Sequence, residues 1–375
     1  MNILITGGAG FIGTHLTQYL LSQGHSITIL DNFLPQIHGG VQDLSPDLQP
    51  HVRLVRGDIA DIAVLTTALK DVQCIVHLAA ETGTGQSMYE IARYERTNLT
   101  GTALIYDLLV RGVGRHVERI VVASSRAIYG EGAYLCPEHG LVYPPSRSAK
   151  EKEMGLFDPV CPVCFGPCDS TATPETAPFQ PSSFYGLTKQ VQEQMVFMFG
   201  QVLGITSIAL RYQNVFGPGQ SLQNPYTGIL AIFSNLAREG KTIQVFEDGM
   251  ESRDFVYIED VVHATAASIT AHLSGCHAFN VGSGQRTSVL EVARMMNTFY
   301  GGRSEIQITG AFREGDIRHG LADIERVHSA LKYKPGWEFS RGLMAFLEWA
   351  NEFAPTRSGY EQSLTEMKER GLLRG

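Results

Sequence analysis

The sequence contains a tyrosine and a lysine four residues apart, Tyr185 and Lys189 in the segment YGLTK. They begin a stretch with helical hydrophobic spacing, residues 183–203, and a spacing of four places both side chains on one helix face, a turn apart. An ammonium group near a phenol favours the phenolate and lowers the phenol pKa from about 10 toward neutrality. The pair therefore predicts a general base, although this spacing is also common among surface residues.

A pair of serines, Ser124 and Ser125, follows the apolar run at residues 119–123, which predicts a strand. Open α/β sheets bind their ligands outside the carboxyl ends of the strands. We therefore expect Ser125 to bind the same substrate oxygen as Tyr185 and to help in passing its proton.

A proline- and glycine-rich stretch, residues 131–179, separates these two sites and is long for a structureless loop. Its metal-ligand candidates form two pairs of soft ligands, Cys136 with His139 and Cys161 with Cys164. Four such ligands are the number that a closed, structural zinc site requires, and such a site leaves no position for a reactive water. Cys168 is a fifth candidate, either spare or in place of His139. The alternative is a set of free thiols, and Phe165 departs from the commoner Cys-Pro-x-Cys-Gly form.

The amino-terminal thirty residues read as strand, glycine turn, helix, strand and acid, with the turn GGAGFIG at residues 7–13. Gly7 permits the tight turn, Gly10 lets the backbone approach a pyrophosphate, and Gly13 lets the helix pack on the sheet. Asp31 after the second strand suits the adenosine ribose hydroxyls, and no arginine follows it in residues 32–36. The pattern predicts a dinucleotide site that favours NAD over NADP.

Further predicted strands at residues 52–56, 74–78, 119–123 and 207–211 alternate with helical segments. This alternation predicts an α/β fold with a Rossmann-type, doubly wound parallel sheet. Asp58 follows one of these strands at a position suited to the adenine amine. Ala79 and Ala80 follow another, where small side chains suit close passage of the cofactor backbone.

Composition excludes several classes of function. The formal net charge is −8, with 43% hydrophobic and 18% charged residues, which is typical of a soluble globular protein and not of a nucleic-acid binder. No apolar run reaches membrane-spanning length, and the first strand begins without a charged leader. We expect a cytoplasmic protein that binds neither nucleic acid nor membranes. Six cysteines in a chain of this length do not suggest a disulfide framework.

Along nearly its whole length the sequence resembles the extended short-chain dehydrogenases/reductases that act on nucleotide sugars. The shared motifs are GGAGFIG, HLAA at 77–80, TNLTGT around Asn98, SSRAIYG at 124–130, YGLTK, LRYQNVFGPGQ at 210–220, SRDFVYIEDV at 252–261, FNVGSG at 279–284 and REGD at 313–316. The segments at 80–94 and 223–256 are most similar to members that act as dTDP-L-rhamnose 4-epimerases, with UDP-glucose 4-epimerases among their relatives.

The resemblance implies oxidation of the sugar at C4, with Tyr185 as base and bound NAD as hydride acceptor. Dehydratases of the family need a carboxylic acid just after the catalytic serine, and Arg126 and Ala127 stand there instead. We therefore expect a 4-epimerase that inverts C4 through a transient 4-keto intermediate, with dTDP-L-rhamnose as substrate and dTDP-6-deoxy-L-talose as product. The alternatives are a UDP-hexose 4-epimerase and an NAD(P)-dependent reductase of 4-keto sugar nucleotides.

Residue chemistry and the resemblance together imply three groups of site residues. The catalytic group is Ser125, Tyr185 and Lys189. The NAD contacts are Gly7, Gly10, Phe11, Ile12, Gly13, Asp31, Asn32, Asp58, Ile59, Leu78, Ala79, Ala80, Asn98, Ser124, Tyr185, Lys189 and Tyr212. The contacts to the nucleotide-diphosphate sugar are Thr82, Thr84, Gln86, Ser125, Arg126, Asn214, Gln223, Asn224, Arg253 and Arg313. For the last two arginines the alternative is a surface ion pair.

The resemblance also implies a division of the chain and an oligomeric state. Residues 1–213 form the NAD-binding domain, with 131–179 as the Cys/His insertion and 254–281 returning to it. Residues 214–253 and 282–375 form a substrate-binding lobe, with a charged end at 361–374 that we expect to fray. Helices at 91–110 and 183–203 carry apolar stripes that relatives pair in a four-helix bundle, so we expect a homodimer, although the stripes also suit an intrachain core.

Overall fold

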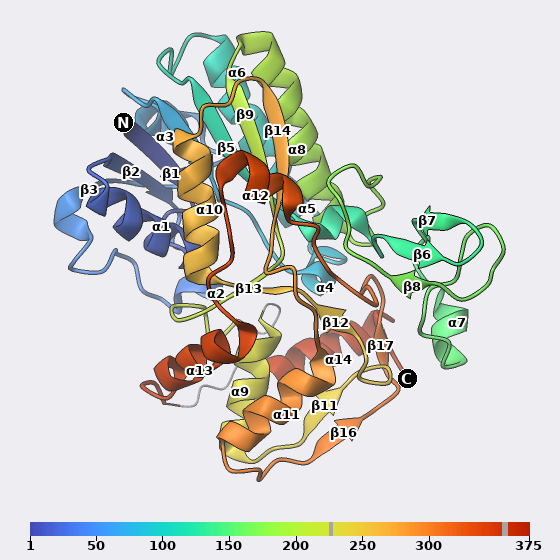
Figure 1. Cartoon of the computed structure of the whole chain (residues 1–375). Helices are drawn as coiled ribbons and strands as arrows, with labels where there is room; N and C mark the ends of the chain where they lie inside the picture. Colours follow the sequence, from blue (N-terminus) through green and yellow to red (C-terminus); the bar gives the residue numbers. More distant parts are fainter. Residues whose placement is uncertain (225–227, 355–358) are drawn as a thin grey trace.

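A seven-stranded parallel sheet forms the larger part of the molecule (Figure 1), and it confirms the expected doubly wound α/β fold. The computed structural model describes residues 1–224, 228–354 and 359–375. In sheet order the strands are β14 (Cys276–Val281), β9 (Thr206–Tyr212), β5 (Arg119–Ser125), β4 (Cys74–His77), β1 (Asn2–Thr6), β2 (Ser26–Asp31) and β3 (Val52–Arg56). The direction of winding reverses between β1 and β4, and a crevice for ligands is expected there.

Helices cover both faces of this sheet, so its strands are apolar on both sides. One face packs against α1 (Phe11–Ser22) and α10 (Ile258–Thr270), next to which lies α12 (Glu325–Leu331). The other face packs against α3 (Ile62–Ala68), α6 (Gly101–Val110) and α8 (Phe184–Leu203). None of the helices in the described residues is long and apolar enough to cross a membrane.

A second, smaller group of elements lies beyond the carboxyl ends of the sheet strands (Figure 1). These elements are β10 (Asn214–Phe216), α9 (Ile229–Glu239), β11 (Ile243–Val245), β12 (Ser252–Arg253), β13 (Phe255–Tyr257), β15 (Thr287–Ser288), α11 (Val289–Phe299), β16 (Ile306–Ile308), β17 (Phe312–Arg313), α13 (Phe339–Ala350), α14 (Tyr360–Glu369) and β18 (Leu373–Arg374). The chain returns from this group to the main sheet through α10 and β14. The division into two lobes at the boundaries given above remains our proposal, and residues 225–227 and 355–358 of the second lobe lie outside the described part.

The insertion at residues 131–179 projects from one side of the molecule as a small three-stranded sheet with one short helix (Figure 1). Its elements are β6 (Tyr134–Cys136), β7 (Gly140–Val142), α7 (Ala149–Glu153) and β8 (Asp169–Ser170). Its core cluster contains only Tyr134, Cys136, Val142 and Cys161 as buried apolar side chains. So small a core contributes little stability, and the insertion therefore depends on other interactions.

Two expectations about local structure need correction. The predicted helix at 91–110 is helical over its whole length, but it is interrupted by a π-helical segment, Glu95–Thr100, between α5 (Ile91–Tyr94) and α6. The expectation of a frayed chain end is wrong, because α14 packs against the body of the protein and β18 pairs with β17. The strand there depends on pairing with residues 312 and 313 and the helix on packing around Phe246 and Ala311, neither of which sequence periodicity reveals.

The backbone of α8 lies very close to the backbone of the segment that follows β5. A Cβ atom at Gly186 would lie 2.5 Å from the carbonyl oxygen of Ala127, so only glycine allows this approach. Ser183 caps the helix by accepting a hydrogen bond from the Gly186 amide. The first turn of α8 is thereby held against the carboxyl end of β5, which places Tyr185 beside Ser125.

Candidate active site

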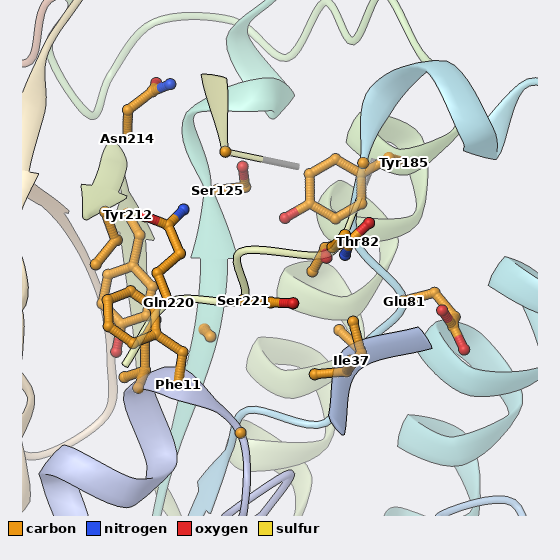
Figure 2. Close-up of a pocket in the computed structure, with 18 of the residues that line it drawn as sticks. Phe11, Ile37, Glu81, Thr82, Ser125, Tyr185, Tyr212, Asn214, Gln220 and Ser221 are labelled. Atoms are coloured by element: carbon orange, nitrogen blue, oxygen red, sulfur yellow. The ribbon is translucent and has the colours of Figure 1, made fainter. Parts of the chain in front are cut away.

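A cavity of about 680 Å³ lies outside the carboxyl ends of β1, β4 and β5, and both groups of elements line it. Figure 2 shows Ser125 and Tyr185 on one wall, with Phe11 and Tyr212 together at another. The cavity lies at the reversal of winding between β1 and β4, where the sheet topology predicts a ligand. It is the natural candidate for a binding site for both a cofactor and a substrate.

The glycine turn after β1 leaves room that side chains would fill. A Cβ atom at Gly13 would lie 2.6 Å from the Cα atom of Gly8, and one at Gly7 would lie 2.8 Å from the amide nitrogen of Ala79. Gly10, at the amino end of α1, makes no side-chain cap, so the helix terminus faces the cavity with its backbone amides. These features fit a dinucleotide pyrophosphate.

Asp31 ends β2 at the edge of the same cavity and is held by the backbone. Its carboxylate accepts hydrogen bonds from the amides of Ala9, at 3.0 Å, and Phe33, at 2.8 Å. His38 Nε2 lies 3.5 Å from the same carboxylate. The side chain is therefore fixed in orientation, as the recognition of ribose hydroxyls would require.

Tyr185 and Ser125 both line the cavity, and Figure 2 shows their side chains near one another. Burial raises the pKa of the Tyr185 phenol, while the neighbouring Ser125 hydroxyl and the Arg126 charge act in the opposite direction. This corrects the sequence argument, in which Lys189 lowers the pKa toward neutrality. The ammonium of Lys189 instead donates to the Ala123 carbonyl at 2.9 Å and lies 6.0 Å from the centre of the Tyr185 ring.

Burial also lowers the pKa of Lys189 from 10.5 to about 7. Its ammonium is buried away from water and forms no ion pair with a carboxylate in the described part of the chain, so the charged form is destabilised. A cation in the adjacent position, such as the oxidised nicotinamide ring of bound NAD, would add to the forces that favour a phenolate at Tyr185.

Buried groups support the end of β5 from behind. Ser124 donates to Glu193 at 2.6 Å, and Glu193 pairs with Arg211 at 2.5 Å. The guanidinium of Arg211 also donates to the hydroxyl of Tyr129 at 2.8 Å. The hydroxyl of Ser124 is therefore already used within the protein, and of these two serines it is Ser125 that lies beside Tyr185.

Three arginines line the other side of the cavity. Arg126 donates through Nε to Asn214 at 2.9 Å, and burial lowers the pKa of Arg126 to about 10 with help from the neighbouring Arg253. The Nε atom of Arg313 is buried and has no hydrogen-bond partner within the described residues. Guanidinium groups in this arrangement suit a bidentate anion such as a diphosphate.

Sequence reasoning missed two acids in this part of the cavity, Glu251 and Asp316. Glu251 lies 3.8 Å from Arg253, and burial raises the pKa of Glu251 to about 7. Both acids adjoin the motifs that supplied the arginines, SRDF and REGD, so their position in the sequence was an available signal. The carboxylates offset part of the positive charge that the arginines bring into the cavity.

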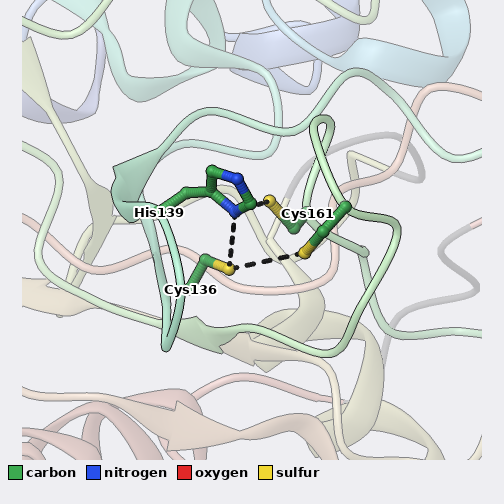
Figure 3. Close-up of side chains that lie close together, drawn as sticks. Cys136, His139 and Cys161 are labelled. Carbon is green, nitrogen blue, oxygen red and sulfur yellow. Dashed lines mark hydrogen bonds between the residues drawn. The ribbon is translucent and has the colours of Figure 1, made fainter.

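Away from the cavity, the insertion brings together the four predicted metal ligands (Figure 3), whose ligand atoms all lie within 4.8 Å of one another. Cys136 Sγ is 3.7 Å from Cys164 Sγ and 3.6 Å from His139 Nδ1, and Cys161 Sγ is 3.8 Å from the same nitrogen. A tetrahedral zinc ion, with bonds of about 2.3 Å to sulfur and about 2.0 Å to nitrogen, separates two sulfurs by about 3.8 Å and sulfur from nitrogen by about 3.5 Å.

These distances fit the edges of a zinc-sized tetrahedron. Cys168, the fifth candidate, lies outside the cluster and is 3.3 Å from the carbonyl oxygen of Pro159. The structure therefore brings His139 rather than Cys168 into the set of ligands.

Residues 3–148 and 163–282 match the model of a protein family described as the NAD dependent epimerase/dehydratase family. The chain belongs to this family. The gap in the match, residues 149–162, lies within the insertion and contains the first cysteine of its second pair. Most of the family's shared region is thus the sheet, its helices and the cavity described above.

Several relatives are similar over almost the entire chain. A dTDP-L-rhamnose 4-epimerase from Burkholderia thailandensis is 40% identical over 351 residues, which are 92% of this chain and 94% of the relative. A putative UDP-glucose 4-epimerase from Methanocaldococcus jannaschii is 29% identical over 92% of this chain and 97% of the relative. Among solved structures, MoeE5 in complex with UDP-glucuronic acid and NAD has a TM-score of 0.74, with 26% identity over 94% of this chain and 99% of the other.

Most residues that sequence reasoning assigned to the NAD and substrate sites of this epimerase/dehydratase family member line the cavity. They are Gly7, Gly10, Phe11, Ile12, Gly13, Asp31, Asn32, Ile59, Leu78, Ala79, Ala80, Thr82, Thr84, Gln86, Ser124, Ser125, Arg126, Tyr185, Lys189, Tyr212, Asn214, Asn224, Arg253 and Arg313. Their location agrees with those assignments, while the role of each residue stays a prediction.

Three assigned residues lie outside the lining, and two of them have structural partners. Asp58 accepts from the Ala60 amide at 2.7 Å, and Gln223 lies beside Gly39. Asn98 is buried and exchanges hydrogen bonds with the backbone of Glu81, at 2.8 and 3.1 Å, and donates to Thr188 at 2.9 Å. Asn98 therefore ties the loop after β4 to the first turns of α8, which positions both walls of the cavity.

The lowered pKa of Lys189 predicts that the free energy of unfolding of this protein depends on pH. Between about pH 7 and pH 10.5 the unfolded chain holds a proton on Lys189 that the folded protein has released. The stability contributed by this group is therefore lowest below pH 7 and rises with pH through that window. We expect the free energy of unfolding of the wild type, relative to Lys189→Met, to rise as the pH increases from 7 to 10 in urea titrations. A difference that stays constant with pH would contradict the depressed pKa.

Proposed function

We propose that the protein is an NAD-dependent nucleotide-sugar 4-epimerase, with dTDP-L-rhamnose as its substrate and dTDP-6-deoxy-L-talose as its product. The observation that carries this proposal is the Tyr185 phenol beside Ser125 in the wall of a cavity built on the NAD dependent epimerase/dehydratase fold. The 40% identity to a dTDP-L-rhamnose 4-epimerase supports the choice of sugar and nucleotide. The similarity to a putative UDP-glucose 4-epimerase makes UDP-hexoses the second candidates.

The residues in the cavity divide the reaction between them. Tyr185 takes the proton from the C4 hydroxyl, and Ser125 holds the same oxygen by a hydrogen bond. NAD, held by the glycine turn and Asp31, would supply hydride acceptance and return at C4, and the keto form of the sugar would turn over in the cavity between the two. Tyr185 then gives the proton back to the C4 oxygen, so that the configuration at C4 is inverted with no net oxidation.

The residues after Ser125 favour epimerisation over dehydration. A 5,6-elimination needs an acid near C5 and C6, and Arg126 and Ala127 cannot transfer a proton in that way. Arg126 instead remains bound to Asn214, at the substrate side of the cavity. We assign Arg253 and Arg313 to the diphosphate, and the glycine turn with Asp31 to NAD.

We also propose that Cys136, His139, Cys161 and Cys164 hold a structural zinc ion. The ligand distances and the small apolar core of the insertion support this assignment. Zinc would link the β6–β7 hairpin, which supplies Cys136 and His139, to the loop that supplies Cys161 and Cys164. Its role would be to fold the insertion, because four protein ligands fill the coordination shell.

A homodimer through α6 and α8 is the third part of the proposal. Leu108 and Phe199, part of the predicted stripes, pack within the chain's own core. Met198 and Val202 on α8, by contrast, are 61% and 71% exposed, one helical turn apart. An exposed apolar face on a long helix is suited to pairing with a second copy.

The epimerase reaction predicts a C4-inverted sugar without net reduction of NAD. We expect NMR to detect that product when purified protein is given dTDP-L-rhamnose, and not, or far more slowly, with UDP-glucose or UDP-N-acetylglucosamine. Tyr185→Phe removes the proton acceptor and should lower kcat by at least about 100-fold, while calorimetry detects unchanged NAD binding. Stoichiometric NADH consumption would identify a reductase instead, and full turnover by Tyr185→Phe would refute the assignment of the base.

The zinc assignment predicts one zinc ion per chain by elemental analysis of the purified protein. Cys161→Ser removes one ligand from the cluster and should lower the zinc content well below one. Cys168→Ser is the matched control, since its thiol lies outside the cluster, and it should retain the ion. Wild-type protein free of zinc, with the cluster thiols open to a thiol reagent, would contradict the assignment.

The dimer predicts twice the 41.1 kDa chain mass in light scattering. Replacing both Met198 and Val202 by glutamate places charges in the apolar face and should give monomers. Val163→Glu, on an exposed apolar residue of the insertion, serves as the control and should leave the mass unchanged. A wild-type protein that scatters as a monomer at micromolar concentration would exclude this dimer.

A further inference from the structure

The loop at residues 313–318 has two sides, and the insertion holds one of them. On the front of this loop, Arg313 and Asp316 line the cavity. On its back, nearly every residue is bound by the insertion or by the residues that immediately follow it. The loop therefore lies between the substrate site and a segment of the chain that the proposed reaction does not use.

Lys152, in the short helix α7 of the insertion, is the first of these contacts. Its side chain is 2% exposed, and its ammonium lies 3.0 Å from the carboxylate of Glu314 and 3.4 Å from the carbonyl oxygen of Arg313. The same ammonium lies 4.5 Å from the centre of the Phe312 ring. A buried lysine thus binds the backbone of the residue that we assign to the substrate diphosphate.

Arg147 makes the second contact, from the segment between β7 and α7. It donates to the Asp316 carbonyl oxygen at 3.1 Å and forms ion pairs with Glu131, at 2.8 Å, and Glu247, at 2.7 Å. All three side chains are almost fully buried, so each charge depends on its partners. Glu131 belongs to the insertion and Glu247 to the turn after β11, so Arg147 links the two.

Two more hydrogen bonds hold the backbone of this loop. Glu131 accepts a hydrogen bond from the Arg318 amide at 2.8 Å, and Ser182 donates to the Gly315 carbonyl at 2.7 Å. The guanidinium of Arg318 in turn pairs with Glu247, at 3.0 Å, and with Asp158 of the insertion, at 2.7 Å. The backbone between Arg313 and Arg318 is therefore fixed largely by groups outside the loop.

We propose that the insertion is a brace for the substrate site, in which Lys152 and Arg147 are positioning residues that hold Arg313 and Asp316 in place for the nucleotide diphosphate. The inference rests on the proposed function in assigning a nucleotide diphosphate to the cavity. A displacement of the loop would move the Arg313 guanidinium away from the phosphates. Because the NAD site lies on the other side of the cavity, at the glycine turn, loss of the brace weakens nucleotide-sugar binding and spares NAD.

Lys152→Met tests this directly, because it keeps the apolar stem and removes the two polar contacts to the loop. We expect calorimetry with dTDP alone, and with UDP in a parallel series, to give a dissociation constant about tenfold higher than that of the wild type. NAD affinity and melting temperature should change little, since Glu314 is partly exposed and can turn to water. Lys152→Arg, which retains the charge, should recover most of the affinity.

The matched control is Lys150→Met, an exposed lysine on the same helix, which should bind dTDP like the wild type. Arg147→Lys is a second variant: it keeps a cation between Glu131 and Glu247 but cannot make all of the contacts of a guanidinium. In turnover assays both Lys152→Met and Arg147→Lys should raise KM more than they lower kcat.

Two results would overturn the inference. If Lys152→Met and Arg147→Lys bind dTDP and UDP as the wild type does, the insertion does not position the loop. If they weaken NAD and nucleotide equally, the contacts serve general stability alone. A wild-type protein that binds neither dTDP nor UDP would refute the proposed function itself, and this result is distinct from both.

Discussion

The structure depends on one constraint: charged and ionisable groups around the cavity are buried and have lost their contact with water. Burial raises the pKa of Tyr185 and lowers that of Lys189, so it disfavours the charged form of both groups. The protein offsets these shifts through specific neighbours: the Ser125 hydroxyl, the Arg126 guanidinium and the Ala123 carbonyl. The chemistry of the phenol therefore depends on how closely α8 approaches the end of β5, which Gly186 permits.

The same constraint explains the rest of the cavity. Arginines suited to a diphosphate also repel one another, as the lowered pKa of Arg126 beside Arg253 indicates. Glu251 and Asp316 supply nearby negative charge. Arg313 ends β17, which pairs with β18, but Asp316 lies in the turn that follows, outside any helix or strand. Buried ion pairs around Arg147 and Arg318 bind that loop to the insertion, and such pairs favour a defined geometry more than they add net stability.

These contacts indicate a structural role for the insertion. Glu131 and Arg147 flank the β6–β7 hairpin that carries Cys136 and His139, so the ion pairs and the Cys/His cluster lie in the same segment. Under the proposed zinc assignment, the metal and the ion pairs would together order this segment and support the surface on which the substrate diphosphate would rest.

Local sequence determined much of this protein. The alternating strands, the glycine turn, the order of Ser125 and Tyr185, and the spacing of the Cys and His pairs are local patterns, and the sheet, the cavity lining and the cluster appear where those patterns indicated. Only the tertiary structure decided that Asn98 ties the loop after β4 to α8, that Lys189 binds a carbonyl rather than the phenol, and that Arg147 and Lys152 reach a loop more than 160 residues further along the chain. Periodicity and spacing report on neighbours within one helix or strand, whereas burial and charge pairing depend on distances between elements, which are fixed only when the chain has folded.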